Sequence, residues 1–469
     1  MFRGTTDMTS GGDRFTGRRV TVMGLGKFGG GLGAARFLAE HGARVTVTDT
    51  KTDHEMAESA AMLGGLGIRF VFGGHDMNDF TSADIVVVSP AVPRNSEYVH
   101  AARAARAELT TEIGLFVTLC PAPVCGITGS NGKTTTVSMI GAILDHDGQP
   151  FHVGGNIGGS LLSSLTVMTP DDRVVLELSS FQLEWLADMA WSPHIAAVLN
   201  ITPNHLDRHR TFEEYRDAKS AILRFQKPCD TAVLVRDDSG SRSLGECVNG
   251  SLVWVGTNLD SGMEGLTLER GWIVRRAAGE TMRIFDTGEL VLPGAHNVTN
   301  AMTACACCLS MGADIASIRS GMGSFRGLPH RLEFVAENRG VKFFNDSKAT
   351  TPESTVAAVN AFSGRVIPIL GGYDKGVPFS GMAQSIGHRV SWAALIGQTA
   401  PAIEEALAAA GIGFTRYDTL EDAVAGSIAR AQRGDVVMLS PGCASYDMFT
   451  DYEDRGERFK GIVKIQTQR

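Results

Sequence analysis

Short runs of apolar residues alternate with helix-like stretches along most of the chain. The runs at residues 19–23, 44–49 and 84–89 are rich in valine, and each one ends in a polar residue or is followed by glycine. Stretches rich in alanine and leucine, such as residues 33–41, follow them. This alternation predicts βαβ units with parallel sheets, in which ligands bind at the carboxyl ends of the strands.

The length of 469 residues corresponds to about three domains, at roughly 150 residues for each domain. We expect an α/β protein in which a polar leader at residues 1–14 is flexible. A Rossmann-like domain at residues 15–115 should follow. Then come a central P-loop ATPase-type α/β domain with a mostly parallel sheet, at 116–327, and a second Rossmann-like domain at 328–469.

The composition narrows the possible classes of function. The chain is 43% hydrophobic and 20% charged, with a formal net charge of −8, which disfavours nucleic acid as the main partner. No apolar segment reaches the roughly 18 residues of a membrane span, and the leader lacks the apolar core of a signal peptide. We therefore expect a cytoplasmic protein, and we expect a monomer. Cys305 and Cys308 form a C-x-x-C among small residues, a pattern that favours close helix packing over a metal site.

Residues 126–136 read Gly-Ile-Thr-Gly-Ser-Asn-Gly-Lys-Thr-Thr-Thr, between an apolar run and a helical pattern. Gly129 and Gly132 allow the backbone N–H groups to turn inward, and the new helix directs its positive end toward an anion. Lys133 adds a charge and Thr134 a hydroxyl for Mg²⁺. The loop is a variant of the P-loop pattern because Ile127 stands where that pattern has glycine.

The first domain contains the sequence Gly-Leu-Gly-Lys-Phe-Gly, beginning at Gly24 and including Gly26, after its first strand. Asp49 ends the second strand, as in a dinucleotide-binding unit, and Ser89 and Pro90 begin a rigid turn after a later strand. We expect Asp49 and Ser89 to face one crevice that binds a nucleotide. The pattern does not specify which nucleotide.

Glu177 interrupts an apolar strand in the central domain. A buried carboxylate requires a positive partner, so a metal ion beside a triphosphate is favoured over a buried ion pair. The glycine-rich segment 153–158 predicts a turn in which Asn156 can contact phosphate.

His205, Asp207 and His209 follow the next strand and could form a metal cluster, although a single ligand, His205, is the favoured interpretation. The helix after them starts with Thr211 and has the pattern of a capping box. Lys219 lies near the edge of the apolar face of this helix, and by itself would be a snorkelling lysine.

Four segments in this order, Gly-Ser-Asn-Gly-Lys-Thr-Thr, Gly-Asn-Ile-Gly, Glu-Leu-Ser-Ser-Phe-Gln-Leu and Asn-Ile-Thr-Pro-Asn-His-Leu-Asp-Arg, resemble the Mur ligases, ATP-dependent amide-forming enzymes of peptidoglycan synthesis. The resemblance implies ATP, two Mg²⁺ ions, and CO₂ bound as a carbamate on Lys219. It implies catalytic roles for Lys133, Glu177, His205 and Lys219, and metal binding by Thr134, Glu177, His205 and Lys219. The implied ATP-binding residues are Gly129, Asn131, Gly132, Lys133, Thr134, Thr135, Asn156, Asn297, Asn300, Arg331 and Asp346.

Three strand patterns in the third domain each end in polar residues, which predicts another nucleotide-type sheet. Asp-Ser-Lys-Ala-Thr and Ser-Pro-Gly-Cys-Ala-Ser resemble the branch of the family that adds D-glutamate. This implies that D-glutamate is bound by Lys348, Thr350, Lys375, Ser445 and Tyr452. The implied second substrate, UDP-N-acetylmuramoyl-L-alanine, would be bound by Gly24, Gly26, Asp49, Ser89 and Pro90. Two departures from the branch are Thr351-Pro352, where asparagine commonly follows, and Tyr452, where phenylalanine is common.

The implied reaction transfers the γ-phosphoryl group of ATP to the acceptor carboxylate, and the amine of D-glutamate then attacks the acyl phosphate. Alternatives are another amide ligase of the Mur or folylpolyglutamate type, or a non-enzymatic nucleotide-sensing module. The sensing module would leave Lys133, Glu177, His205 and Lys219 without a role.

Overall fold

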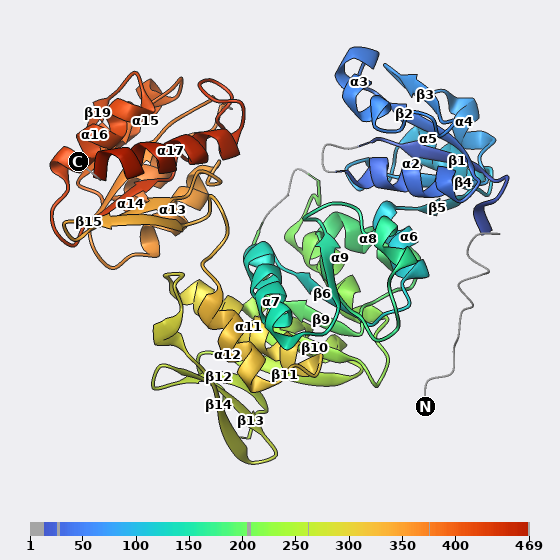
Figure 1. The fold of residues 1–469 in the computed structure, drawn as a ribbon, viewed down its shortest axis with the longest axis horizontal. Helices are drawn as coiled ribbons and strands as arrows, with labels where there is room; N and C mark the ends of the chain where they lie inside the picture. The colour runs from blue at the N-terminus through green and yellow to red at the C-terminus, as the bar shows by residue number, and fades with distance from the viewer. Residues whose placement is uncertain (1–13, 26–28, 204–207, 261, 375, 468–469) are drawn as a thin grey trace. The chain divides into compact units, whose positions relative to one another are not determined.

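The computed structural model describes residues 14–25, 29–203, 208–260, 262–374 and 376–467 (Figure 1). The chain divides into two compact units. One contains the residues up to Gly288 together with Thr299–Met322, and the other contains Glu289–Val298 with the residues from Gly323 onwards. The first unit holds two sheets and the second unit holds a third, which agrees with the three sheets expected from the sequence.

The first sheet is parallel throughout and has the order β3-β2-β1-β4-β5 in the described part of the chain. Its strands are β1 (Arg19–Met23), β2 (Arg44–Asp49), β3 (Arg69–Phe72), β4 (Ile85–Val88) and β5 (Glu108–Thr110). Its helices are α2 (Gly30–Glu40), α3 (Asp53–Ala61), α4 (Met77–Thr81) and α5 (Glu97–Ala104). Helix α2 begins three residues before the position expected from the sequence.

The second sheet has the order β14-β13-β12-β11-β10-β9-β6-β8-β7 and is parallel from β12 to β7. Its strands are β6 (Val124–Thr128), β7 (Phe151–Gly155), β8 (Arg173–Glu177), β9 (Ile195–Val198), β10 (Thr231–Val235), β11 (Ser251–Gly256), β12 (Gly265–Glu269), β13 (Trp272–Ala277) and β14 (Glu280–Asp286). The accompanying helices are α6 (Glu112–Leu119), α7 (Lys133–Asp147), α8 (Ser180–Asp188), α9 (Phe212–Arg224), α10 (Ser239–Arg242), α11 (Ala295–Ser310) and α12 (Ile315–Ser324).

Two local expectations for this sheet need correction. Residues 153–155 were expected in a turn, but they lie in β7, where the Leu161 side chain packs so close to Gly154 that a Cβ would not fit. The Thr211 side chain caps α9 by accepting a hydrogen bond from the Glu214 N–H, as expected. Glu214 was expected to complete a capping box, but its carboxylate instead pairs with Arg210.

The first two sheets share one hydrophobic core. Buried side chains from both, such as Val22 on β1 and Val174 on β8, belong to the same cluster. Trp185 of α8 is 2% exposed and packs among side chains of the first sheet and its helices, including Val88 at the end of β4. Because burial of apolar area is the main stabilising contribution, these two parts stabilise each other.

The sheet of the second unit has the order β15-β16-β20-β17-β18-β19. Its strands are β15 (Glu333–Asn338), β16 (Val341–Asn345), β17 (Val366–Leu370), β18 (Trp392–Leu395), β19 (Gly413–Arg416) and β20 (Val436–Leu439). Its helices are α13 (Pro352–Asn360), α14 (Ser380–Ile386), α15 (Ala400–Ala409), α16 (Leu420–Arg430) and α17 (Tyr452–Thr467).

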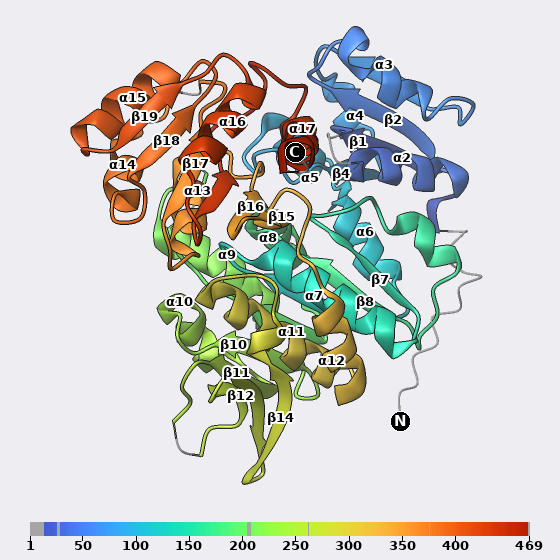
Figure 2. The ribbon, with the colours of Figure 1, turned by 60° about the vertical axis from the view of Figure 1, so that its left-hand side comes forward.

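Helices cover both faces of this sheet (Figure 2). Along β17, Val366 and Leu370 pack in the cluster with α13, α14 and α15, whereas Ile367 and Ile369 pack in the cluster with α16 and α17. A strand buried on both faces needs apolar residues at every position, which explains its continuous apolar run. Strands β16, β20 and β17 are adjacent and parallel, so their polar ends meet at one edge, as predicted.

Candidate active site

The loop between β6 and α7 has the strand–loop–helix geometry predicted for a phosphate cradle. Gly132 has a φ of +85° and immediately precedes the helix, and a Cβ at this position would lie 2.4 Å from Oδ1 of Asn300. Glycine is therefore required both for the backbone angle and for the space. The Lys133 ammonium lies over the loop and donates to the carbonyl oxygens of Gly129 at 2.8 Å and Ser130 at 3.1 Å.

Glu177 lies at the end of β8, beside the start of α7. Its side chain is buried, and its carboxylate accepts hydrogen bonds from the Thr134 hydroxyl at 2.8 Å and from the Asn156 amide at 3.0 Å. The structure thus brings together three residues that were predicted to contact ATP or a metal. A carboxylate and a hydroxyl are oxygen ligands of the kind that Mg²⁺ prefers, so the residues present fit that ion.

Lys219 is only 1% exposed, so the interpretation as a snorkelling lysine is wrong. Its ammonium donates to the Gly129 carbonyl at 3.0 Å and lies 4.7 Å from the centre of the Tyr215 ring. Burial, reinforced by the positive charge of Lys133, holds the pKa of Lys219 well below its ordinary value, and the negative charge of Glu177 opposes this shift. Two lysines and one glutamate therefore converge on the same loop.

Asn200 was not identified as a site residue from the sequence. It follows β9, and its side-chain oxygen accepts a hydrogen bond from the N–H of Asn131, while its amide donates to the Asn131 carbonyl. The paired bonds fix the middle of the phosphate loop to the neighbouring strand. Its signals in the sequence are its position at the end of an apolar run and its place at the start of the segment Asn-Ile-Thr-Pro-Asn-His-Leu-Asp-Arg.

Gly26, His205 and Lys375 lie outside the described residues, as does Asp207, so their predicted roles stay predictions. His209 is described, and its Nε2 lies 2.9 Å from the Ser180 hydroxyl in a buried position. Within the described ranges, no group of three or more His, Cys, Asp or Glu side chains could hold a metal ion.

Gly24, Asp49 and Ser89, three of the residues predicted to bind a nucleotide, lie together at the carboxyl ends of β1, β2 and β4. Gly24 has a φ of +87°, and a Cβ there would lie 3.3 Å from Ser89 and 4.0 Å from the Asp49 carboxylate. The Asp49 carboxylate accepts hydrogen bonds from the N–H groups of Leu25 and Lys51, so it restrains the backbone after β1 and after β2.

In the second unit, Asp346 is buried and accepts hydrogen bonds from the Leu332 N–H and the Ser440 hydroxyl. Burial raises the pKa of Asp346 to about 7, although these bonds and the charge of Arg331 act in the opposite direction. Arg331 also lowers the pKa of His296, a shift caused mainly by burial of the imidazole. Leu332, the residue after Arg331, donates to Asp346, so Arg331 and Asp346 lie close together.

Three further residues predicted to contact ATP lie on α7 and α11. Thr135 is buried in the first turn of α7, and Asn300 lies against Gly132. Asn297, one turn earlier on α11, is buried and donates to the Pro293 carbonyl at 2.7 Å. This bond restrains the start of α11.

The Lys348 ammonium lies 5.5 Å from the centre of the Tyr452 ring, so two predicted D-glutamate residues are adjacent. Ser445 is buried in the segment after β20, and the Thr350 N–H donates to the Lys348 carbonyl. A fully buried arginine, Arg455, was missed from the sequence. It donates to backbone carbonyls of Ser347, Cys443 and Ala444 and thereby joins the two segments that carry the predicted residues.

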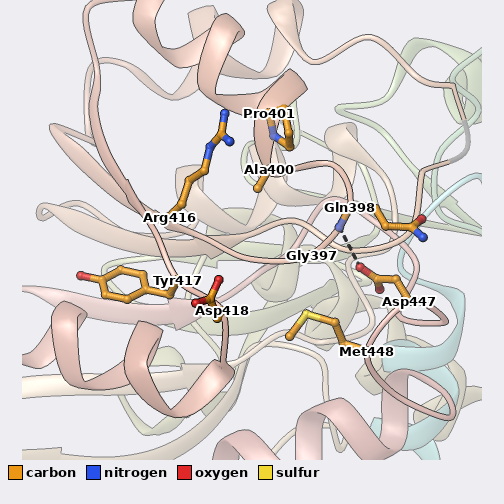
Figure 3. A pocket seen from close by; sticks show the side chains of 9 residues that line it. All are labelled: Gly397, Gln398, Ala400, Pro401, Arg416, Tyr417, Asp418, Asp447 and Met448. Carbon is orange, nitrogen blue, oxygen red and sulfur yellow. Dashed lines mark hydrogen bonds between the residues drawn. The ribbon is translucent and has the colours of Figure 1, made fainter.

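A cavity of about 520 Å³ lies elsewhere in this unit, near the start of α15 (Figure 3). In Figure 3 the Asp447 carboxylate accepts a hydrogen bond from the Gln398 N–H, at 3.0 Å. The side chains that line the cavity are Gly397, Gln398, Ala400, Pro401, Arg416, Tyr417, Asp418, Asp447 and Met448. Lys348, Thr350, Ser445 and Tyr452, the described residues predicted to bind D-glutamate, are not part of this lining.

Three family models match the chain in order. They are described as the Mur ligase MurD-like N-terminal domain (residues 18–111), the Mur ligase middle domain (127–308) and the glutamate ligase domain of Mur ligases (330–443). No helix within the described residues is long and apolar enough to cross a membrane.

Two curated relatives extend the match over almost the whole chain. The UDP-N-acetylmuramoylalanine–D-glutamate ligase of Symbiobacterium thermophilum is 39% identical over 95% of this chain and 98% of the relative. The enzyme of the same name from Roseiflexus is 40% identical over 97% of this chain and 100% of the relative.

Solved structures show the same fold. UDP-N-acetylmuramate–alanine ligase MurC of Thermotoga maritima has a TM-score of 0.58 at 20% identity, covering 96% of this chain and 100% of that one. MurF ligase of the same organism, in complex with ADP, has a TM-score of 0.56 at 18% identity. The match covers 98% of this chain and 100% of that chain.

Proposed function

Since the chain belongs to the Mur ligase family, and within it to the UDP-N-acetylmuramoylalanine–D-glutamate ligases, we propose that it joins D-glutamate to UDP-N-acetylmuramoyl-L-alanine at the expense of ATP. The structural observation that carries the proposal is the convergence of Lys133, Lys219 and Glu177 on the phosphate loop. A sensing module would have no use for two lysines and a buried carboxylate at one loop. An amide ligase needs the charge of Lys133 at the ATP phosphates and oxygen ligands such as Glu177 to hold Mg²⁺ beside them.

The reaction has two steps. A carboxylate oxygen of the acceptor attacks the γ-phosphorus of ATP, a new P–O bond forms and ADP leaves. The amine of D-glutamate then attacks the acyl carbon, a C–N bond forms, phosphate leaves, and the amine releases a proton. Because phosphoryl transfer is catalysed mainly by positioning and charge stabilisation, Lys133 and the loop N–H groups supply most of what the first step needs.

Thr134 and Glu177 would hold Mg²⁺ with His205, whose position lies outside the described residues. When bound, Mg²⁺ neutralises charge on the phosphate oxygens. Asn156 fixes the orientation of the Glu177 carboxylate through its amide hydrogen bond. Asn131, Asn297, Asn300, Arg331 and Asp346 would complete the contacts to the nucleotide.

Lys219 is proposed to carry a carbamate. A neutral amine reacts with CO₂, forming an N–C bond and releasing a proton, and the low pKa of the buried Lys219 favours that neutral form. The product is an anion, which would provide a second carboxylate-like ligand beside Glu177.

The carbamate proposal can be tested with wild-type enzyme and two variants. Lys219→Ala and Lys219→Arg should both lose activity, by on the order of 100-fold or more, because neither side chain can form the carbamate. Adding bicarbonate to CO₂-depleted buffer should restore the wild type but neither variant. Full activity of Lys219→Ala, together with no effect of bicarbonate on the wild type, would disprove the proposal.

D-glutamate is a dianion with one amine, and cations with hydroxyl groups suit its two carboxylates. Lys348, Thr350, Ser445 and Tyr452 would bind it together with Lys375, which lies outside the described residues. Burial raises the pKa of Tyr452 to about 12, so its phenol stays a proton donor at neutral pH. A neutral phenol can donate to a carboxylate.

The function is tested by phosphate release from ATP with UDP-N-acetylmuramoyl-L-alanine and each amino acid in turn. We expect release with D-glutamate and little release with L-glutamate or without the acceptor. Turnover with L-amino acids but not with D-glutamate would refute the substrate assignment. We further propose that the enzyme works in the cytoplasm, where ATP is available, and as a monomer that carries all of these residues on one chain. Light scattering of the purified protein checks the second point.

A further inference from the structure

Arg208 makes an unusual set of contacts with the turn that follows β4. Its guanidinium donates to the carbonyl oxygens of Ala91 at 2.7 Å, Pro90 at 2.9 Å and Val92 at 3.0 Å. It also lies 4.4 Å from the centre of the Phe181 ring. The planar fork of an arginine matches several acceptors at once, which the point charge of a lysine does not.

These bonds determine which way the turn presents its other groups. In a trans peptide the C=O and the following N–H point in opposite directions. When the Pro90 carbonyl points toward Arg208, the Ala91 N–H points away from it. The Val92 N–H is used inside the turn, where it donates to the Ser89 carbonyl at 2.9 Å. Arg208 therefore directs the Ala91 N–H toward the opposite side of the turn from itself.

A second arginine, at the end of the same turn, bonds to α8. Arg94 follows the turn, donates to the Glu184 carbonyl at 2.7 Å, pairs with Asp188 and lies 5.2 Å from the Trp185 ring centre. Arg208 thus reaches from the middle part of the chain to the first sheet, and Arg94 reaches from the first sheet to α8. The turn at residues 89–93 is held at its middle by one arginine and at its end by the other.

The segment that carries Arg208 is also fixed beside the phosphate loop. The imidazole of the next residue, His209, lies 2.9 Å from the Ser180 hydroxyl and stacks on Phe181 with an interplanar angle of 13°. Ser180 is three residues beyond Glu177 in the chain. A displacement of the turn can therefore be transmitted through Arg208 to the end of β8.

We infer that Arg208 is a positioning residue for the nucleotide-linked acceptor, because it orients the 89–93 turn so that the Ala91 N–H can donate to an anionic oxygen of that substrate. This inference rests on the proposed function, in which Ser89 and Pro90 contact the acceptor. Arg94 supports the same turn by anchoring its end. Neither arginine is expected to contact D-glutamate.

The test is steady-state kinetics of Arg208→Met with each of the three substrates varied in turn. Loss of charge-assisted hydrogen bonds to the turn should raise the KM for the acceptor about tenfold or more. The KM for D-glutamate should change less than twofold. Arg208→Lys should fall between wild type and Arg208→Met, because it keeps the charge but not the fork. Arg210→Met is the matched control, since Arg210 is two residues away, has an 84% exposed side chain and pairs with Glu214.

Direct binding of the acceptor without ATP, measured by calorimetry, separates positioning from general damage. The inference is supported if Arg208→Met weakens acceptor binding while its melting temperature stays close to that of Arg210→Met. An unchanged acceptor KM, or an equal rise in all three KM values, would overturn it. If Arg208→Met does not fold, the same comparison is made with Arg208→Lys. The proposed function is judged separately, on wild-type enzyme: absence of D-glutamate-dependent phosphate release there refutes the function and not the positioning role.

Discussion

At the scale of single residues, Glu177 illustrates how burial converts an ordinary carboxylate into a specific ligand. It is 2% exposed and accepts hydrogen bonds from two neutral donors, Thr134 and Asn156, and the Lys219 side chain lies nearby. A carboxylate in such surroundings requires positive charge. Its neighbours Thr134, Asn156 and Lys219 come from three separate segments of the chain.

We predict that Glu177→Gln raises the Mg²⁺ concentration needed for half-maximal activity by about tenfold or more, because the amide keeps the size of the side chain but loses its charge. Titration of phosphate release against Mg²⁺ measures the effect. Glu184→Gln, on α8, is the control and should leave the Mg²⁺ requirement unchanged. An unchanged Mg²⁺ requirement in Glu177→Gln would show that Glu177 does not bind the metal.

At the scale of elements, α7 depends on a left-handed glycine at each end. Gly132 precedes the helix with a φ of +85° and lies against Asn300, whereas Gly148 follows it with a φ of +73° and has no atom within 4 Å of the Cβ that alanine would add. The two positions share a backbone requirement but differ in their surroundings. They therefore form a natural pair for substitution.

We predict that Gly132→Ala and Gly148→Ala each lower the free energy of unfolding by roughly 1–2 kcal/mol, the usual cost of a left-handed non-glycine residue. Only Gly132→Ala should also raise the KM for ATP, about tenfold, because its methyl group displaces Asn300 and distorts the cradle. Chemical unfolding and ATP-dependent kinetics measure the two effects. Equal KM values in both variants would show that the contact with Asn300 has no role in ATP binding.

At the scale of the whole molecule, the first two sheets are joined by polar contacts as well as by their common core. The Ser160 hydroxyl donates to the Glu112 carboxylate at 2.5 Å, and a Cβ on Gly33 of α2 would collide with Ser160. Burial raises the pKa of Glu112 from 4.5 to about 7, although the bond from Ser160 opposes the shift. The contribution of Glu112 to the free energy of unfolding should therefore depend on pH.

We predict that Glu112 destabilises the folded protein increasingly as the pH rises from about 4.5 to about 7. Between these pH values the unfolded chain has lost the Glu112 proton while the folded chain still holds it. The free energy of unfolding therefore falls as the pH rises through this range. Glu112→Gln cannot lose a proton, so its stability relative to wild type should increase across this range, by no more than about 3 kcal/mol. Denaturant unfolding at several pH values measures this, and parallel pH profiles would contradict it.

Much of the fold follows from signals between neighbouring residues. Apolar runs that end in polar residues or are followed by glycine predicted β1, β2 and β4 and the parallel strands β16, β17 and β20 of the second unit. Strand propensity and the turn that follows depend on consecutive residues, so a local pattern can show them. The short strand β3 was missed because its residues are partly exposed, and β7 was mistaken for a turn because its glycines are explained only by a packed neighbour, Leu161.

The sequence by itself determined the phosphate loop, its lysine and the family, because these depend on residue types at fixed spacing along one segment. Only the tertiary structure decided that Lys219 is buried, that Asn200 braces the loop, and that Arg208 holds the 89–93 turn. The Lys219 contact to the loop joins residues 90 positions apart, and the Arg208 contacts join residues up to 118 positions apart. Burial and hydrogen-bond partners depend on which segments meet in space, and no local pattern of spacing specifies that meeting.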